Sequence, residues 1–406
     1  MPWPRLEFAV PRKRRLVYLG ATGNSLLRTY IAESDFVIYR NVRDLCNVWI
    51  ALIAILFGRW SARGYYRTFL MLVRPSFVVT FEDNSLEFYL TKSYRPDCKT
   101  FCIQNGRRDS YSRVATKTIW SLIREVSHQG VAPDVVATHG APWSQYFTSS
   151  LGMCSTNVVE IGSVRNNALN IGTKRSEPRV LFISSFPNLG PEGNLQDFSP
   201  SILGYWQGEQ VEFGSFYSIE GLIAQSTAAI ARERDIEFLV VGKRPSWQKG
   251  EFAYFSEALE GYKWRYLPSE TEASSYAAVS ETDVIVNIDS TFGYEMFARG
   301  IRVAFVSARM HHAGLPHVRD CEFGFPFITE TTGPFWTNQS TDDEVERVVN
   351  YVIDTDESEW KSVIHSYRES IMPFDFGNTR VCTLLTSLGI STSGPGAWNT
   401  NEIPNN

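Results

Sequence analysis

The chain has 406 residues, 43% of them hydrophobic and 20% charged, and its formal net charge is −5. This length predicts two domains rather than one, and the apolar content is sufficient for a core in each. The net negative charge argues against a nucleic-acid-binding protein. The basic run at residues 11–15 is local, and we interpret it as a solvated approach to the first strand.

The six cysteines include no Cys-x-x-Cys pair, and the six histidines include no His-x₃-His spacing. A structural zinc site is therefore not expected. The N-terminus has no apolar segment before its basic run, so the sequence predicts no signal peptide. We expect a cytoplasmic protein with reduced thiols.

One apolar segment, VWIALIAILFG, spans residues 48–58. At a rise of ~1.5 Å per residue, this segment is too short to cross a hydrocarbon core of ~30 Å. We therefore expect residues 48–57 to form a buried helix. A shallow peripheral contact with the inner membrane is the less favoured alternative.

The first half of the chain alternates between predicted strands and predicted helices. Buried strands are predicted at residues 15–20, 35–40, 76–82, 100–106 and 134–140, with helical segments at about 43–73 and 115–127. This alternation indicates an α/β domain with a parallel sheet that is covered on both faces. Gly, Asn, Ser and Pro are then dense at residues 161–178, which is typical of a linker.

The second half repeats the pattern and is predicted to be another α/β domain. Strands are predicted at residues 179–186, 236–243, 283–289 and 302–307, with helices at 218–234, 342–353 and 358–370. Residues after about 391 are rich in Gly, Pro, Asn and Ser, so the sequence predicts a loose tail there.

The stretch NIDSTFGYEMFARG at residues 287–300 places Asp289, Ser290 and Thr291 directly after a predicted strand. Such a turn lies at the carboxyl end of the strand, where open α/β sheets bind ligands. Ser290 or Thr291 can cap a helix over residues 292–299. The free N–H groups and the dipole at the start of that helix suit a phosphate.

Two further residues of this stretch fit a ligand site. Gly293 has no Cβ, so the backbone and a ligand can approach closely, and the carboxylate of Glu295 can take ribose hydroxyls. The alternative is an ordinary capped helix whose glycine makes a buried packing contact. The local pattern alone does not decide between the two.

A resemblance to a known family rests on this turn and on four other stretches. The spacing of Ser290, Thr291, Gly293, Tyr294, Glu295 and Gly300 before an apolar strand resembles the donor-site turn of GT-B-fold glycosyltransferases. Over roughly residues 76–360 the chain also resembles bacterial surface-carbohydrate (lipopolysaccharide) biosynthesis proteins, a group described as transferases. The matching stretches are FEDNSLEFY (81–89), IQNGRR (103–108), IGSVRNN (161–167) and FGFPFITETTGPFW (323–336).

The resemblance implies an α/β fold in which two Rossmann-like domains face each other across a cleft (GT-B-like). Residues 1–165 would form the acceptor-side domain and residues 175–373 the donor domain. A helix at 374–390 would cross back to the first domain, before a flexible tail at 391–406.

The implied function is transfer of a sugar from a nucleotide-sugar to a saccharide or lipid-linked acceptor, in surface polysaccharide or lipopolysaccharide biosynthesis. GT-B enzymes generally work without a bound metal, so no metal and no other cofactor is expected. Helix N-termini and Lys or Arg side chains must then neutralise the leaving phosphate.

A looser resemblance concerns transferases that use CMP-sugars, such as the Kdo and polysialic acid enzymes. The stretch GKRP at residues 242–245 stands where those enzymes carry a basic-Pro motif. Arg244 replaces their usual His, which argues against CMP as the leaving group, although Arg is a good phosphate ligand. Lys243 and Arg244 are predicted to end a strand at the same sheet edge as Ser290; the alternative is a pair of surface cations.

The predicted donor-binding residues are Lys243, Arg244, Asp289, Ser290, Thr291, Phe292, Gly293 and Glu295.

The catalytic base is expected in the first domain. Asp83 is the first choice and Glu82 the second, because both follow the predicted strand at 76–82 and only one can face the cleft. An Asx turn is the alternative for Asp83. His139, at the end of another predicted strand, is an alternative base, although a lone histidine is more often structural. The predicted acceptor-binding residues are Asn84, Gln104, Asn105 and Arg107.

Two other features allow different interpretations. His311, His312 and His317 cluster near Asp320, but their spacing matches no standard metal site, so we interpret them as a loop near the donor. GATGNS at residues 20–25 resembles part of a dinucleotide-binding loop, and Arg40 ends the second predicted strand, where the 2′-phosphate of NADP would lie.

An NADP oxidoreductase is disfavoured, because Leu26 stands in the place of the third glycine and the chain contains no Tyr-x₃-Lys. A nucleotide-sugar epimerase, a glycerophosphate-type transferase and a non-catalytic binding protein stay open as alternatives.

Overall fold

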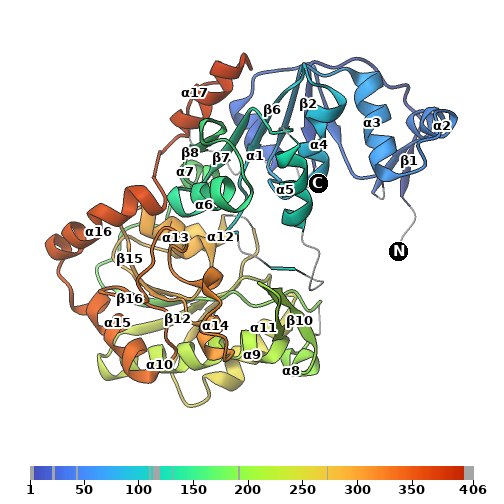
Figure 1. Ribbon diagram of the computed structural model, residues 1–406. Coiled ribbons are helices and arrows are strands. Elements are labelled where there is room, and N and C mark those ends of the chain that lie inside the picture. Colours follow the sequence, from blue (N-terminus) through green and yellow to red (C-terminus); the bar gives the residue numbers. More distant parts are fainter. Residues whose placement is uncertain are drawn as a thin grey trace.

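The computed structural model describes residues 4–20, 23–42, 44–108, 111–112, 119–129, 131–190, 193–271 and 273–396. In these residues the chain forms two α/β halves, each built around a sheet that consists mainly of parallel strands (Figure 1). The expected fold class, two Rossmann-like domains, is confirmed. Residues 21–22 of the GATGNS stretch, residue 43 and residues 115–118 of a predicted helix lie outside the described residues.

The first sheet has the strand order β3-β2-β5-β6-β7-β8, and all of its described pairs are parallel. Its strands are β2 (Leu16–Leu19), β3 (Phe36–Tyr39), β5 (Phe77–Thr80), β6 (Lys99–Ile103), β7 (Val135–Thr138) and β8 (Val158–Glu160). Side chains alternate between the two faces: Val17 and Leu19 point to one core, and Leu16 and Tyr18 to another. Both faces are therefore buried, as the continuous apolar runs predict.

Helices cover the two faces of this sheet. One face packs against α3 (Ala62–Val73), α4 (Leu86–Tyr94) and α5 (Ile119–His128). The other packs against α1 (Asn24–Tyr30), α7 (Val164–Ala168) and α17 (Thr379–Leu388). The helix α7 occupies the stretch that the sequence predicts as a linker, and four of its five residues are buried.

The second sheet has the order β13-β12-β9-β14-β15-β17-β16, and only its last pair is antiparallel. Its strands are β9 (Arg179–Ile183), β12 (Glu237–Val241), β13 (Arg265–Leu267), β14 (Val284–Asn287), β15 (Arg302–Val306), β16 (Thr332–Gly333) and β17 (Trp336–Thr337). Its helices are α10 (Ile219–Glu233), α11 (Lys249–Ala258), α12 (Ser274–Ala278), α13 (Thr291–Ala298), α15 (Asp342–Asp354) and α16 (Glu357–Ile371). A single apolar cluster joins them into one core.

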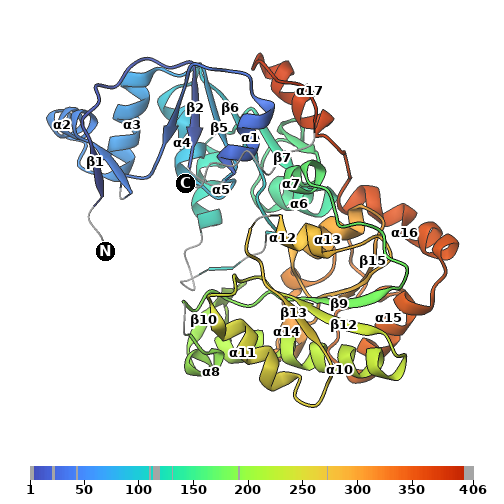
Figure 2. The same cartoon turned by 180° about the vertical axis from the view of Figure 1, so that it is seen from behind.

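Short elements complete the described structure. They are β1 (Arg5–Glu7), β4 (Leu45–Asn47), α2 (Val48–Leu56), α6 (Ala141–Gln145), α8 (Leu195–Phe198), β10 (Ile202–Trp206), β11 (Glu209–Glu212), α9 (Phe213–Tyr217) and α14 (Arg309–His312), with a π-helical turn at Tyr146–Ser150 and 3₁₀ turns at Ser155–Asn157 and Arg319–Cys321. In both views α6 and α7 lie where the two halves meet (Figures 1 and 2).

The end of the chain returns to the first half. Figures 1 and 2 show α17 beside the first sheet, and Val381 and Leu385 pack in the core that contains Leu16 and Tyr18. Residues 391–396 do not form the loose tail that the sequence predicts. Their backbone is paired with the segment after α1, where the N–H of Ala32 donates to the carbonyl of Ser391 at 2.9 Å. Residues 397–406 of that predicted tail lie outside the described residues.

The prediction of a buried helix at residues 48–57 is wrong. The helix α2 forms, and the side chain of Asn47 caps it, but of its residues only Ile50 and Ala54 are buried. It lies at the outer edge of the first half and packs against α3 on one side (Figure 1). Trp49, Leu52, Ile55 and Leu56 are exposed, and the remaining residues of the helix are partly buried. In the described parts of the chain, no helix is long and apolar enough to cross a membrane.

Candidate functional site

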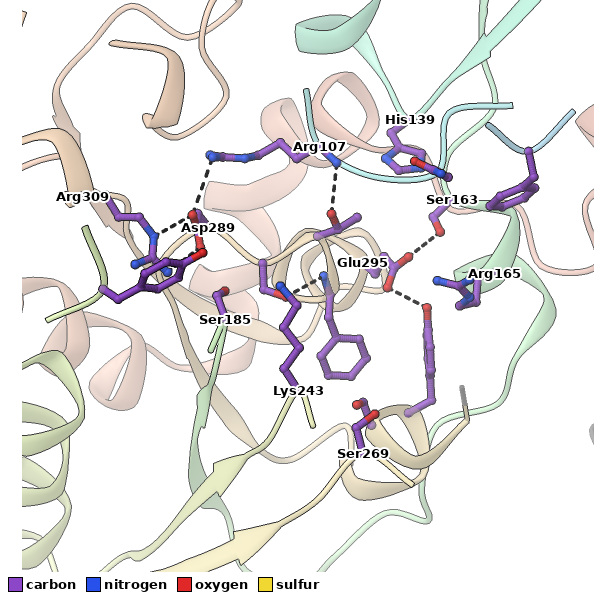
Figure 3. Close-up of a pocket in the computed structure, with 18 of the residues that line it drawn as sticks. Arg107, His139, Ser163, Arg165, Ser185, Lys243, Ser269, Asp289, Glu295 and Arg309 are labelled. Atoms are coloured by element: carbon purple, nitrogen blue, oxygen red, sulfur yellow. Dashed lines mark hydrogen bonds and ion pairs between the residues drawn. The ribbon is translucent and has the colours of Figure 1, made fainter. Parts of the chain in front are cut away.

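A cavity of about 430 Å³ lies between the two halves, where the carboxyl ends of both sheets face each other (Figure 3). Such ends are where open α/β sheets bind ligands. Residues after β5, β6, β7 and β8 line it from the first half: Phe81, Asn105, Arg107, His139, Ser163 and Arg165. Residues after β9, β12, β13, β14 and β15 line it from the second half, among them Ser185, Lys243, Ser269, Asp289 and Arg309.

The turn after β14 begins α13 as the sequence predicts. Ser290 is the N-cap, and its hydroxyl accepts from the N–H of Phe292 at 3.4 Å. The side-chain oxygen of Asn287 accepts from the N–H of Ser290 at 3.2 Å and closes the turn. A Cβ on Gly293 would lie 2.2 Å from the side chain of Asn287. The glycine therefore allows packing within the domain, which corrects the prediction that it lets a ligand approach.

Asp289 belongs to a buried charge network. Arg309 donates to its two carboxylate oxygens at 2.7 and 3.0 Å and to Glu220 at 2.6 Å. The guanidinium of Arg309 also lies 4.7 Å from the ring centroid of Phe216. Burial raises the pKa of Asp289, but the charges of Arg309 and Arg107 outweigh it and hold this pKa well below its ordinary value. Asp289 is therefore ionised and fixed in place.

Arg107 reaches from the first half into the second. Its backbone N–H donates to Oγ1 of Thr291 at 3.2 Å, and its side chain donates to the carbonyl of Cys321 at 3.1 Å. The guanidinium lies 3.7 Å from the carboxylate of Asp289 (Figure 3). The N-terminus of α13 thus lies beside a cation of the opposite domain.

The lining of the cavity carries more positive than negative charge. Its cations are Arg107, Arg165, Lys243 and Arg309, and its carboxylates are Asp289 and Glu295. The side chain of Lys243 is open to the cavity, and partial desolvation lowers its pKa, against the opposing effect of Asp289. Such a lining suits a ligand that carries phosphate groups.

Arg244 does not line the cavity. Its guanidinium donates to the carbonyl of Phe186 at 3.1 and 2.9 Å, and Glu251 accepts from the N–H groups of both Lys243 and Arg244 at 2.9 and 2.8 Å. Glu251 and Arg244 therefore hold the end of β12 in place, and Lys243 is the cation that they present to the cavity.

Glu295 lines the cavity and joins the two halves. The hydroxyl of Ser163, from the first half, donates to Oε1, and the hydroxyl of Tyr276 donates to Oε2 at 2.6 Å (Figure 3). Burial raises the pKa of Glu295, and these two hydrogen bonds oppose that rise. Each oxygen keeps a second lone pair, so the carboxylate can still accept from a ligand hydroxyl.

The structure places the first-choice base away from the cavity. Asp83 is fully buried, and Arg108 donates to both of its oxygens, with a distance of 2.6 Å between Nε and Oδ2. Glu82 lies against Gly20, where a Cβ would be 2.4 Å from its carboxylate. Neither residue nor the exposed Asn84 lines the cavity. The geometry therefore disfavours Asp83 and Glu82 as acceptors of a proton in the cleft.

Of the three predicted bases, His139 is the one that lines the cavity. Its backbone N–H donates to Oε1 of Gln104 at 2.9 Å. Gln104 itself is buried and donates to the carbonyl of Gly106 at 2.7 Å, so it supports the loop rather than the cavity. The ring of His139 packs edge-to-face on Trp143, and its Nδ1 is buried without a hydrogen-bond partner among the described residues. Burial, with the charge of Arg108, lowers the pKa of His139 to about 3.

His311 and His312 form hydrogen bonds outside the cavity. Nδ1 of His311 lies 3.0 Å from the hydroxyl of Ser340, and Nε2 of His312 lies 2.9 Å from that of Ser218. Neither lines the cavity. Across the described ranges, no group of three or more His, Cys, Asp or Glu side chains is arranged to hold a metal ion.

Several lining residues are absent from the predicted site. Arg309, the buried partner of Asp289, follows β15 by three residues. Ser163 and Arg165 lie in the matched stretch IGSVRNN, which the local composition indicates as a linker. Arg309 could have been found, because it follows the predicted strand at 302–307. Ser163 and Arg165 follow β8, a strand that the sequence does not predict.

The fold and the position of the cavity define a GT-B-like protein, in which two Rossmann-like domains enclose the site. The structure is similar to the wall teichoic acid polymerase TagF (TM-score 0.50, 12% identity, covering 93% of this chain and 89% of that chain). It is also similar to a glycosyltransferase from Rickettsia africae ESF-5 (TM-score 0.48, 10% identity, 93% and 98% covered). A third similar structure is the UDP-GlcNAc 2-epimerase from Neisseria meningitidis (TM-score 0.47, 10% identity, 92% and 99% covered).

A comparison of the sequence with protein-family models assigns the chain to a family. A family model described as "putative O-antigen biosynthesis protein" matches residues 101–388, which is more than half of the chain. The chain therefore belongs to this family of O-antigen biosynthesis proteins. The curated protein sequences contain no significant match to it.

Proposed function

We propose that this protein is a glycosyltransferase that transfers a sugar from a nucleotide-sugar to a saccharide acceptor in surface polysaccharide biosynthesis. The observation that carries the proposal is the cationic cavity between the facing carboxyl ends of the two sheets. Membership of the O-antigen biosynthesis family supports the choice of substrate class.

The donor would lie against the second half. Lys243 and Arg309 would attract its phosphates, together with the N–H groups at the start of α13. Phe292 and Tyr276 line the same cavity, with ring centroids 5.0 Å apart, and offer aromatic surface to a nucleobase. Glu295 would accept from a hydroxyl of the ribose or of the sugar.

His139 is the base that the geometry supports best. It would take the proton of an acceptor hydroxyl as that oxygen bonds to the anomeric carbon, while the bond from this carbon to the phosphate oxygen breaks. The electron pair stays on the leaving phosphate, which Lys243 and Arg309 neutralise. His139 is neutral before the donor binds, and the negative charge of the bound phosphates would stabilise its protonated form. Asp83 could act only after it releases Arg108.

We also propose that the reaction needs no metal ion. Four cations and two carboxylates line the cavity, and this excess of positive charge can balance the charge that develops on the leaving phosphate. Turnover that is unchanged by a chelator would agree with this, and turnover that divalent metal restores after chelation would not.

Calorimetric titration with a panel of nucleotide-sugars tests the proposed donor site. Replacement of Lys243 by Gln removes one charge from the cavity and should raise the donor Kd by roughly 10–100-fold, as expected for the loss of one charge-assisted hydrogen bond. Lys263→Gln, at an exposed position in the same domain, is the matched control. A panel in which no nucleotide-sugar binds the unaltered protein would refute the proposal.

The products separate this reaction from the two alternatives that use a similar substrate. Transfer of a sugar from a nucleoside-diphosphate donor releases the nucleoside diphosphate, whereas a glycerophosphate-type transfer releases the monophosphate. An epimerase changes the sugar when no acceptor is present. Chromatography of the nucleotides, with and without acceptor, therefore identifies the reaction.

A further inference from the structure

Exposed apolar side chains are concentrated at the outer end of the first half. We call this region the α2 surface; it consists of Leu6, Phe8, Val10, Trp49, Leu52, Ile55, Leu56, Phe57 and Trp60. Leu56 and Trp60 are the most exposed of them, at 83% and 78%. More than half of the large exposed hydrophobic residues in the described parts of the chain belong to this surface. Contiguous apolar patches of this kind mark interaction sites.

The α2 surface is built by specific contacts. The strand β1 pairs with β4, directly before α2. The indole N–H of Trp49 donates to the carbonyl of Phe8 at 2.9 Å, and the side chain of Asn47 donates to the carbonyl of Ala9 at 2.8 Å. These bonds hold the segment after β1 against the helix, and Figure 1 shows β1 beside α2.

Basic residues outnumber acidic ones in the segments that form this surface, although the whole chain carries a net charge of −5. Residues 45–81 contain four arginines and no acidic residue. The guanidinium of Arg59 lies 5.1 Å from the ring centroid of Phe57, and Arg63 is exposed one turn further on. In the N-terminal segment Arg5, Arg12 and Lys13 are exposed; the nearby acidic residues in the sequence are Glu7 and Asp44.

We propose that the α2 surface docks onto an anionic lipid bilayer. At a rise of ~1.5 Å per residue α2 is only ~14 Å long, so it would lie in the headgroup region and not span the core. Trp49 and Trp60 suit this region, because indole rings combine an apolar body with a polar N–H. The arginines would attract the anionic headgroups. The α2 surface lies on the domain that carries His139, so docking would leave the opposite domain free (Figure 1).

Sedimentation of the full chain with lipid vesicles tests this proposal. The unaltered protein should bind vesicles of phosphatidylcholine and phosphatidylglycerol more tightly than vesicles of phosphatidylcholine alone, and high salt should weaken the binding. The triple variant Leu56→Ser, Phe57→Ser and Trp60→Ser should lower the partition coefficient by at least about tenfold, because three membrane-facing side chains are lost. All three positions are exposed, so the fold should persist.

A matched control replaces two exposed aromatic residues of the other domain, Trp247→Ser and Phe252→Ser, which should leave vesicle binding unchanged. The double variant Arg5→Gln and Arg63→Gln should lose the preference for anionic vesicles. The proposal is overturned if the unaltered protein does not bind vesicles, or if the triple variant binds them as tightly as the unaltered protein. A dimer that the triple variant dissociates, without vesicle binding, would instead assign the surface to a second copy of this chain. No donor or acceptor is present in these assays, so their outcome is independent of the proposed transferase activity.

Discussion

The guanidinium of Arg107 lies 3.7 Å from the carboxylate of Asp289, although the two residues follow strands of different sheets. The adjacent backbone N–H of Arg107 donates to Thr291 at the start of α13. A phosphate that enters the cavity here would compete with Asp289 for the same guanidinium. Donor binding would then be linked to the contact between the two domains, because the phosphate binds one arrangement of that contact better than another.

The first prediction concerns this cation. Arg107→Gln should raise the donor Kd by roughly 10–100-fold, the effect of losing one charge-assisted hydrogen bond. Titration calorimetry measures it, with Arg265→Gln as a control at an exposed arginine of the second domain. An unchanged Kd would remove Arg107 from the donor site.

The second prediction concerns the base. His139→Gln keeps a polar side chain in the cavity but removes the proton acceptor, so turnover should fall by about 10²–10⁴. The donor Kd should change little, since His139 is neutral before the donor binds and adds no charge that attracts the phosphates. Steady-state kinetics and calorimetry on the same preparation check both parts. Turnover close to that of the unaltered protein would exclude His139 as the base.

The third prediction separates Asp83 as a structural residue from Asp83 as a base. Asp83→Asn removes the carboxylate that pairs with Arg108 in a buried position, so the free energy of unfolding should fall by about 3–5 kcal/mol. Urea denaturation measures this loss, and the exposed Asp97→Asn is the control. A variant of normal stability with strongly reduced turnover would restore Asp83 as the catalytic base.

The fourth prediction is a pH dependence that arises from Glu295. Its pKa in the folded protein is raised by burial, so its contribution to stability is fully present below the ordinary pKa of 4.5 and is lost as pH rises through the raised value. Glu295→Gln cannot ionise and should lack this loss. Relative to the unaltered protein, the variant should therefore become more stable as the pH rises from about 4 to about 7.

Chemical denaturation at a series of pH values checks this trend. Glu260→Gln, an exposed position, should show none of it. A stability difference that does not vary with pH would mean that Glu295 titrates normally in the folded protein.

The strands and the cap at Ser290 could be predicted because local sequence determines them. The strands β5 and β14 each have four buried residues, of which three are apolar, and a hydroxyl residue after β14 caps α13. The edge at which these strands end is fixed by the parallel topology, so the location of the cavity follows from the fold class.

Contacts between distant residues could not be predicted in this way. Asp83 meets Arg108 across 25 residues, and its sequence neighbours do not indicate that its carboxylate is already paired. Glu295 meets Ser163 across 132 residues and the domain boundary. The exposure of α2 could not be predicted either, because a helix that is apolar on all sides is normally buried.

The return of α17 to the first sheet has a consequence for the order of synthesis on the ribosome. The core around Leu16 and Tyr18 includes Val381 and Leu385, so it lacks one covering helix until nearly the whole chain has emerged. The second half needs no later segment for its sheet and can close earlier. The domain whose strands are made first is therefore the last to be completed.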